Sequence, residues 1–187
     1  MIDTSDIRKN LKVEIDGYPW IVVDFQFVKP GKGQAFTRTK FKNLITGNVI
    51  ERTYKSGEKL EEAAIEEHEM AFLYSQSNNY HFMNNQTYDQ VEMSEDQVGE
   101  AKSFLTENMV VEVMYFKGRP IGIELPNFVE LQIVHTEPAV KGDTVSGATK
   151  IAEVSTGYKM QVPVFLSNEE WIVIDTRTGA YVERVKR

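Results

Sequence analysis

The chain has 187 residues, of which 41% are hydrophobic and 26% charged, a composition typical of globular proteins. It contains no cysteine, which excludes disulfide frameworks, zinc–thiolate sites and cysteine nucleophiles. Its formal net charge of −7 would disfavour a nucleic-acid partner if the charge were evenly spread, because phosphates repel carboxylates.

Sequence signals for a membrane or for export are also missing. The longest uninterrupted apolar run is the five residues 70–74, whereas a membrane-spanning helix needs about 20. The first ten residues lack the apolar core of a signal peptide. We therefore expect a soluble, cytoplasmic protein with no membrane partner.

Alternating apolar residues and frequent turn pairs predict short strands throughout residues 1–63. The expected strands lie near 13–15, 20–27, 36–44 and 48–54. Asp-Gly, Pro-Gly and Thr-Gly pairs mark the turns between them. About five strands in 60 residues suggest a small SH3-like (KOW-like) barrel.

Residues 64–127 predict three strands, a helix and two further strands. The strands are expected at 69–77, 80–84, 88–93, 109–116 and 120–125. Ser94 and Gln97 have the spacing of a capping box, and helical spacing continues as far as Leu105. This order of elements is that of an OB-fold.

Residues 128–187 repeat the pattern with less helix. Five strands are expected, at 128–135, 150–155, 159–166, 171–175 and 180–185, with a single helical turn at 167–170. Pro163 must lie where the sheet needs no N–H donor. The prediction for the whole chain is an all-β fold of three small barrels, an SH3-like domain at 1–63 followed by OB-fold domains at 64–127 and 128–187.

The charge is distributed unevenly over these thirds. Residues 1–63 carry 11 basic and 9 acidic side chains, residues 64–127 carry 3 and 11, and residues 128–187 carry 7 and 8. Between Asp24 and Glu51 there is no acid. That stretch holds five cations: Lys29, Lys32, Arg38, Lys40 and Lys42. Two interpretations stay open. The stretch is either a solvated strand face whose lysines prevent edge-to-edge aggregation, or a surface that faces phosphates.

Residues 29–36 form the most informative stretch. Strands are expected on both sides, Pro30 and Gly31 favour a tight turn, and Gly33 frees the backbone after it. Lys32 should therefore project from a hairpin tip between small neighbours. The loop matches neither the P-loop nor the dinucleotide-binding glycine pattern.

No catalytic or metal site is predicted elsewhere. His68 lies among glutamates but lacks the paired spacing of zinc helices, and the many carboxylates give no identifiable acid–base pair. Four aromatic residues could form a base-stacking platform or fill a barrel interior: Tyr74, Tyr80, Phe82 and Tyr88. The spacing of Tyr181 and Arg184 suits either RNA contact or plain packing.

Taken together, several motifs resemble the bacterial elongation factor P family over the whole chain. They are FVKPGKGQAF at 27–36, KSGE at 55–58, HFM at 81–83, PNFVEL at 126–131, KGDT at 141–144 and DTRTGAYVERV at 175–185. The glycine loop alone would be a weak signal, whereas the set is highly specific.

The resemblance implies a three-domain, tRNA-sized factor that binds the ribosome beside the peptidyl-tRNA and relieves stalling at consecutive prolines. Its first domain would face the tRNA acceptor end and its last domain the small subunit. Many members extend the tip lysine by β-lysylation or an alkyl-alcohol group, and others carry a rhamnosylated arginine there. Lys32 disfavours the arginine branch and implies a lysine-modifying enzyme as a further partner.

The resemblance also implies site residues. The expected RNA contacts are Lys29, Gly31, Lys32, Gly33, Arg38, Lys40, Lys42, Tyr181 and Arg184, with the last two near the anticodon arm. A weaker candidate for contact with the small subunit or the exit-site codon is the loop containing Gly142, Asp143, Thr144 and Gly147. No catalytic residue, metal or cofactor is expected, and the protein should act as a monomer.

Three alternatives remain at this point. The chain could be a ribosome-binding paralogue of the same fold with a different task. It could be an enzyme with the Lys32 amine as nucleophile, which would need a desolvated lysine, whereas a hairpin tip is wet. It could also be an OB module that binds single strands, which the acidic middle third disfavours.

Overall fold

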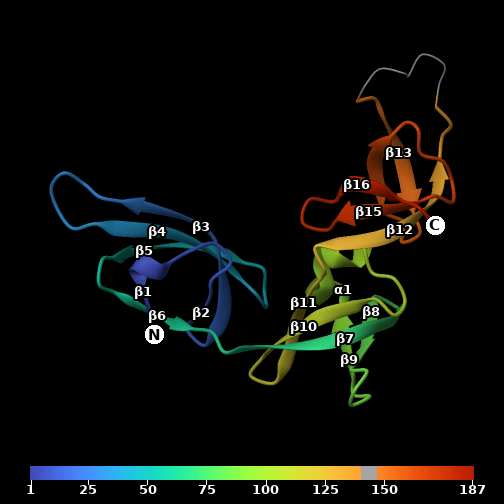
Figure 1. The fold of residues 1–187 in the computed structure, drawn as a ribbon. Helices are drawn as coiled ribbons and strands as arrows, with labels where there is room; N and C mark the ends of the chain where they lie inside the picture. The colour runs from blue at the N-terminus through green and yellow to red at the C-terminus, as the bar shows by residue number, and fades with distance from the viewer. Residues whose placement is uncertain (140–146) are drawn as a thin grey trace. The chain divides into compact units, whose positions relative to one another are not determined.

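A computed structural model describes residues 1–139 and 147–187, and the fold is all-β, as predicted (Figure 1). The chain divides into two compact units, one of residues 1–68 with 113–122 and the other of residues 69–112 with 123–187. The described strands form three sheets. The division into three domains at residues 63 and 127 stays a prediction. No helix in the described part is long and apolar enough to cross a membrane.

The first sheet has six strands in the order β1-β6-β2-β3-β4-β5. Their bounds are β1 Ile2–Asp3, β2 Lys12–Ile15, β3 Tyr18–Val28, β4 Phe36–Asn43, β5 Val49–Lys55 and β6 Lys59–Glu62. A 3-10 turn at Thr4–Asp6 follows β1. The strands β1 and β6 were not predicted, because β1 has only two residues and β6 has a single apolar residue, Leu60, so neither shows alternation.

The core of this sheet comes from the apolar residues whose alternation predicted its strands. Val13, Val22 and Phe41 are fully buried, on β2, β3 and β4. The edge of the Phe41 ring packs against Tyr54 on β5. Because every inward position of β2 and of the first half of β3 is apolar, burial fixes the register of this part of the sheet.

The second sheet has five strands in the order β11-β10-β7-β8-β9. Their bounds are β7 Ile65–Gln76, β8 Asn79–Met83, β9 Gln90–Ser94, β10 Val110–Phe116 and β11 Arg119–Glu124. The predicted capping box is present: the Ser94 hydroxyl accepts from the main-chain N–H of Gln97, and the side-chain oxygen of Gln97 accepts from the main-chain N–H of Ser94. The helix itself is shorter than predicted: α1 covers Glu95–Val98 and ends at Gly99, whose φ of 63° leaves the helical region. A 3-10 segment, Gly99–Ser103, replaces the expected helical turns.

The third sheet has the order β14-β13-β12-β15-β16. Its strands are β12 Phe128–Thr136, β13 Thr149–Val154, β14 Lys159–Pro163, β15 Trp171–Asp175 and β16 Ala180–Val185. Leu131, Ile133, Ile172 and Ile174 are fully buried in its core. The strand expected at 159–166 ends at Pro163. Residues 167–170 form a turn rather than a helical turn, with Glu169 at φ 70°.

Candidate functional site

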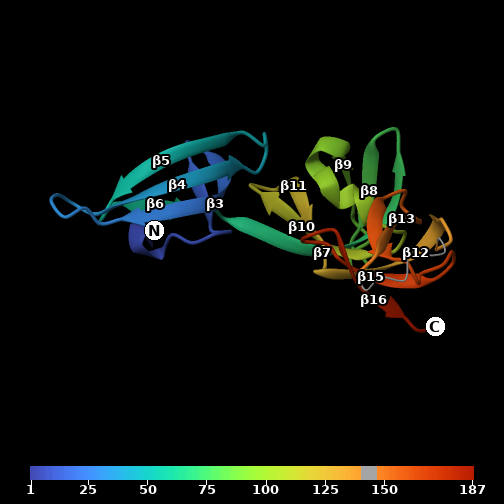
Figure 2. The same ribbon diagram turned by 90° about the horizontal axis from the view of Figure 1, so that it is seen from above.

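The loop of residues 29–35 joins β3 and β4 and projects past the other strands of its unit (Figures 1 and 2). Lys32 lies in the middle of the loop and is exposed. Gly33 has φ 105°, a value that side-chain-bearing residues rarely adopt. Gln34 and Ala35 tie the end of the loop to the turn after β5: Gln34 Nε2 donates to the Ser56 oxygen at 2.9 Å, and the Ser56 N–H donates to the Ala35 oxygen at 3.0 Å. The predicted hairpin tip is therefore present, with its C-terminal side held.

Three of the predicted cations share one face of β4. Residues of β4 alternate between buried and exposed, with Thr37, Thr39, Phe41 and Asn43 buried. Arg38, Lys40 and Lys42 occupy the exposed positions between them. Because side chains on a strand alternate with a period of two, these three point to the same side of the sheet. We call this exposed side the outer face.

The five predicted cations are not engaged by carboxylates. Within residues 1–139 and 147–187, no ion pair of 4.0 Å or less involves Lys29, Lys32, Arg38, Lys40 or Lys42. The Arg38 guanidinium lies over the Phe36 ring at 5.6 Å. The charges of this group therefore remain available to an anionic partner.

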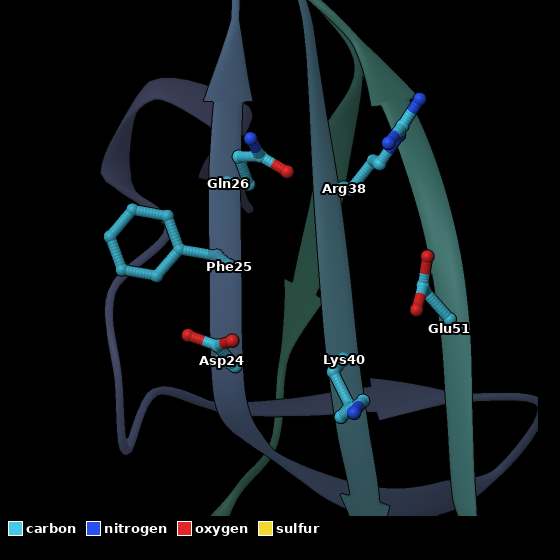
Figure 3. A pocket seen from close by; sticks show the side chains of 6 residues that line it. All are labelled: Asp24, Phe25, Gln26, Arg38, Lys40 and Glu51. Carbon is cyan, nitrogen blue, oxygen red and sulfur yellow. The ribbon is translucent and has the colours of Figure 1, made fainter.

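Two acids lie beside this row of cations, and the sequence analysis did not predict their closeness to it. Lys40 is paired across the sheet with Asp24 on β3 and with Glu51 on β5. The same three residues line a shallow cavity of about 160 Å³ on the outer face, together with Phe25, Gln26 and Arg38. Figure 3 shows Asp24 and Lys40 at the same level on neighbouring strands, with Glu51 on the far side of Lys40. The stretch from 25 to 50 is thus free of acids in sequence, but Lys40, the middle cation of the β4 row, has acidic neighbours in space.

The opposite face of the β3–β4 ribbon is apolar where it passes the end of the barrel. Phe25 and Phe27 are paired with Thr39 and Thr37, and are 39% and 60% exposed. They line a groove of about 280 Å³ with Ile7 and residues of the 3-10 turn. The ribbon therefore has a cationic face and an aromatic face, both next to the Lys32 loop.

Tyr181 and Arg184 lie on the same face of β16 although they are three residues apart. A bulge after the pairing of Glu183 with Val173 brings Tyr181 opposite Ile174 and Arg184 opposite Ile172. Tyr181 packs against the barrel core, and this burial raises the pKa of its hydroxyl. Arg184 donates to Glu170 at 3.4 Å and lies over the Phe165 ring at 5.6 Å.

The remaining predicted positions are less informative. Gly142, Asp143 and Thr144 lie outside the described residues, and Gly147 has φ 87°. Of the four aromatics considered for stacking, Phe82 is fully buried and belongs to the interior, whereas Tyr74 and Tyr88 are exposed. Tyr74 stacks on His81 with ring centroids 4.4 Å apart. Among the residues that the structure describes, no cluster of three or more His, Asp or Glu side chains could hold a metal ion.

Three family models match the chain in succession. They are the elongation factor P KOW-like domain at residues 3–60, the elongation factor P OB domain at 65–123 and the elongation factor P C-terminal model at 129–184. Elongation factor P of Desulforapulum autotrophicum is 52% identical over 99% of both chains. The chain belongs to the elongation factor P family. Elongation factor P 2 of Geobacter sulfurreducens is 51% identical over the full length of both chains.

Membership makes the chain a translation factor of the elongation factor P family. Among solved structures, eukaryotic translation initiation factor 5A from Methanococcus jannaschii aligns with a TM-score of 0.53 at 23% identity, over 66% of this chain and 93% of that chain. That likeness concerns the fold and agrees with an all-β, multi-domain architecture. Within this chain, the KOW-like model spans the Lys32 loop and the cation row of β4.

Proposed function

We propose that the chain binds the ribosome beside the peptidyl-tRNA and promotes peptide-bond formation where consecutive prolines stall synthesis. The observation that carries the proposal is an exposed lysine at the tip of a projecting ribbon whose outer face bears a row of cations, in a chain of the elongation factor P family. Lys32 positions the acceptor end of the tRNA, and Lys29, Arg38, Lys40 and Lys42 contact phosphates.

A positioning role explains how such a factor accelerates the reaction without reacting itself. Proline stiffens the nascent chain, so the reacting groups spend little time aligned. Holding the peptidyl-tRNA in a productive geometry lowers the entropic part of the barrier. Lys32 is exposed, whereas an amine nucleophile is activated by desolvation. The proposed activity is therefore non-enzymatic and needs no cofactor, and the protein works as a cytoplasmic monomer.

The accessibility of Lys32 also suits post-translational extension by a modifying enzyme. Gly31 and Gly33 flank it, and a Cβ placed on Gly31 would meet no atom within 4 Å. An enzyme could therefore enclose the lysine without steric obstruction from its neighbours. An intact mass above the encoded value, mapped to the peptide containing Lys32, tests this part. An unmodified protein with full activity would make the extension dispensable.

At the other end of the chain, we propose that Tyr181 and Arg184 contact the tRNA near the anticodon arm. The Arg184–Glu170 pair is partly exposed, at 46% and 32% of the two side chains, and such pairs contribute little. Arg184 can therefore exchange Glu170 for a phosphate at small cost. The segment with Gly142, Asp143, Thr144 and Gly147 is proposed as a small-subunit contact.

A translation assay on a template with three consecutive prolines tests the proposal. The Lys32→Ala variant should lose rescue of the stalled product. Lys159→Ala, which removes an exposed lysine on β14, should retain it. Normal rescue by Lys32→Ala would overturn the role of the tip lysine. Absence of rescue by the unaltered, modified protein would favour a paralogue with a different task.

A further inference from the structure

Asp24 and Glu51 flank the cation row of β4 on both sides, and the proposed function does not use them. We infer that these two carboxylates confine a bound RNA backbone to the line of β4 and so exclude RNA that approaches in other directions. The inference rests on the proposed function, because it assumes that the β4 row contacts RNA. It assigns Asp24 and Glu51 a role in specificity rather than in affinity.

The charges on the outer face differ between the direction along β4 and the direction across it. Side chains two residues apart on one strand are separated by about 6.8 Å, so Arg38, Lys40 and Lys42 span about 14 Å along β4. Neighbouring strands are about 4.8 Å apart, so the backbones of Asp24 and Glu51 lie about 10 Å from each other across Lys40. A phosphate backbone along β4 meets three cations. A phosphate backbone that crosses β4 at Lys40 meets that single cation between the carboxylates of Asp24 and Glu51.

In the part of the chain that the structure describes, neither carboxylate is held in a close or buried ion pair, so both can repel a nearby phosphate. Glu51 makes no ion pair within the described residues. Asp24 has one ion-pair partner among the described residues, Lys9 at 4.0 Å, with both side chains about two-thirds exposed; such an exposed pair contributes little free energy and opens easily. At physiological ionic strength the Debye length is about 8 Å. A phosphate placed on β3 or β5 at the level of Lys40 therefore lies within reach of a carboxylate.

The strand positions next to Lys40 on the outer face add no further cation; beyond β3, Lys9 lies 4.0 Å from Asp24. On β3 the outer face continues with Gln26, and on β5 with Thr53. Gln26 and Arg38 line the cavity beside Asp24, as Figure 3 shows, while Phe25 points away from β4. Among the strand positions of the outer face, the cations at the level of the two acids therefore lie on β4 alone, which is the arrangement needed to select a backbone direction.

The test compares the full-length protein with an Asp24→Asn/Glu51→Gln double variant. Binding of unfractionated tRNA and of an unrelated 20-base-pair RNA duplex is measured between about 50 and 200 mM salt, where phosphate contacts dominate. The double variant should bind the duplex roughly tenfold more tightly and tRNA less than about threefold more tightly, so that discrimination falls. Glu92→Gln/Glu107→Gln is the matched control. It removes the same charge from two exposed positions in the other compact unit and should leave the ratio unchanged.

The outcomes separate this inference from the proposed function. An unchanged ratio of tRNA to duplex affinity in the Asp24→Asn/Glu51→Gln variant, or a change no larger than that of the control, overturns the inference alone. Arg38→Ala and Lys42→Ala should each weaken tRNA binding and reduce its salt dependence by about one phosphate contact. If they do not, or if the unaltered chain does not bind tRNA, the β4 row is no RNA contact and both proposals fail. The Glu51→Gln single variant, at a position without an ion-pair partner among the described residues, covers the case in which the double variant folds poorly.

Discussion

Gln34 donates a hydrogen bond from its side-chain Nε2 to the main-chain oxygen of Ser56 across 2.9 Å. The bond joins the end of the Lys32 loop to the turn between β5 and β6. It also brings together two of the motifs that identified the family in the sequence, FVKPGKGQAF and KSGE. A second bond, from the Ser56 amide to the Ala35 oxygen at 3.0 Å, runs beside it. We therefore expect Gln34 to hold the tip lysine in position without itself contacting RNA.

The first prediction follows from this bond. Gln34→Ala should reduce rescue at consecutive prolines, because the loop loses one of its two ties and Lys32 samples more positions. The free energy of unfolding should fall by less than about 1.5 kcal/mol, the net value of one hydrogen bond. Gln90→Ala, at an exposed position on β9, is the control and should leave rescue intact. Full rescue by Gln34→Ala would show that the tie does not position the tip.

The second prediction concerns a buried hydroxyl. Thr39 is fully buried on β4, and its Oγ1 has no hydrogen-bond partner among the residues that the structure describes. Thr39→Val should therefore raise the free energy of unfolding by about 1 kcal/mol, since a buried unpaired hydroxyl is costly. Thr136→Val is the matched control, because the Thr136 hydroxyl donates to the Ile151 oxygen at 2.9 Å. Chemical denaturation should give opposite signs for the two variants, and equal destabilisation would contradict this account.

The third prediction concerns the turn before β16. The Tyr158 hydroxyl donates to the Gly179 oxygen at 3.1 Å, and a Cβ on Gly179 would lie 2.5 Å from the same hydroxyl. Gly157 also has a positive φ, 87° against 75°, but open space around it. Each glycine-to-alanine substitution should lower the free energy of unfolding by about 1–2 kcal/mol, because alanine is strained at a positive φ. Gly179→Ala should cost at least about 1 kcal/mol more than Gly157→Ala, because Tyr158 must move. Equal losses in denaturation experiments would refute the steric part.

The fourth prediction is a pH dependence. The hydrogen bonds from the Arg177 side chain to Asp175, at 2.9 and 3.0 Å, lower the pKa of the Asp175 carboxyl below its ordinary 3.8. A carboxyl with a lower pKa in the folded state stabilises the fold above the unfolded-state pKa, and this contribution is lost as the pH falls through the folded-state value. Stability of the unaltered protein should therefore decline more steeply below pH 3.8 than that of Asp175→Asn. An NMR titration of Asp175 with a midpoint at or above 3.8 would contradict the prediction.

Much of the fold and of the tip was predictable because the signals are local. Alternation and turn residues indicate the position of β4, and the strand period of two is enough to put Arg38, Lys40 and Lys42 on one face. The capping box marks the start of α1 for the same reason. Gly99, where α1 ends, could have signalled the early end of the helix, because glycine favours a positive φ at helix termini.

The features that sequence reasoning missed depend on register. Asp24 lies 16 residues before Lys40, and the seven-residue loop between β3 and β4 belongs to no turn type that fixes the pairing of its strands. Burial could not supply the register either, because Phe25 and Phe27 are exposed beyond the end of the barrel. The bulge that brings Tyr181 and Arg184 to one face has no glycine or other local signal in the sequence.

The central claim is that the Lys32 tip lies at the acceptor end of the peptidyl-tRNA, and site-directed hydroxyl-radical probing tests it most directly. The chain has no cysteine, so Lys32→Cys and Lys159→Cys each offer one thiol for an iron chelate, and co-sedimentation with ribosomes checks that both variants bind. Radicals from position 32 should cut the acceptor end of the peptidyl-tRNA, whereas those from position 159 should not. An uncut acceptor end with the probe at position 32, or equal cutting from both positions, would contradict the account.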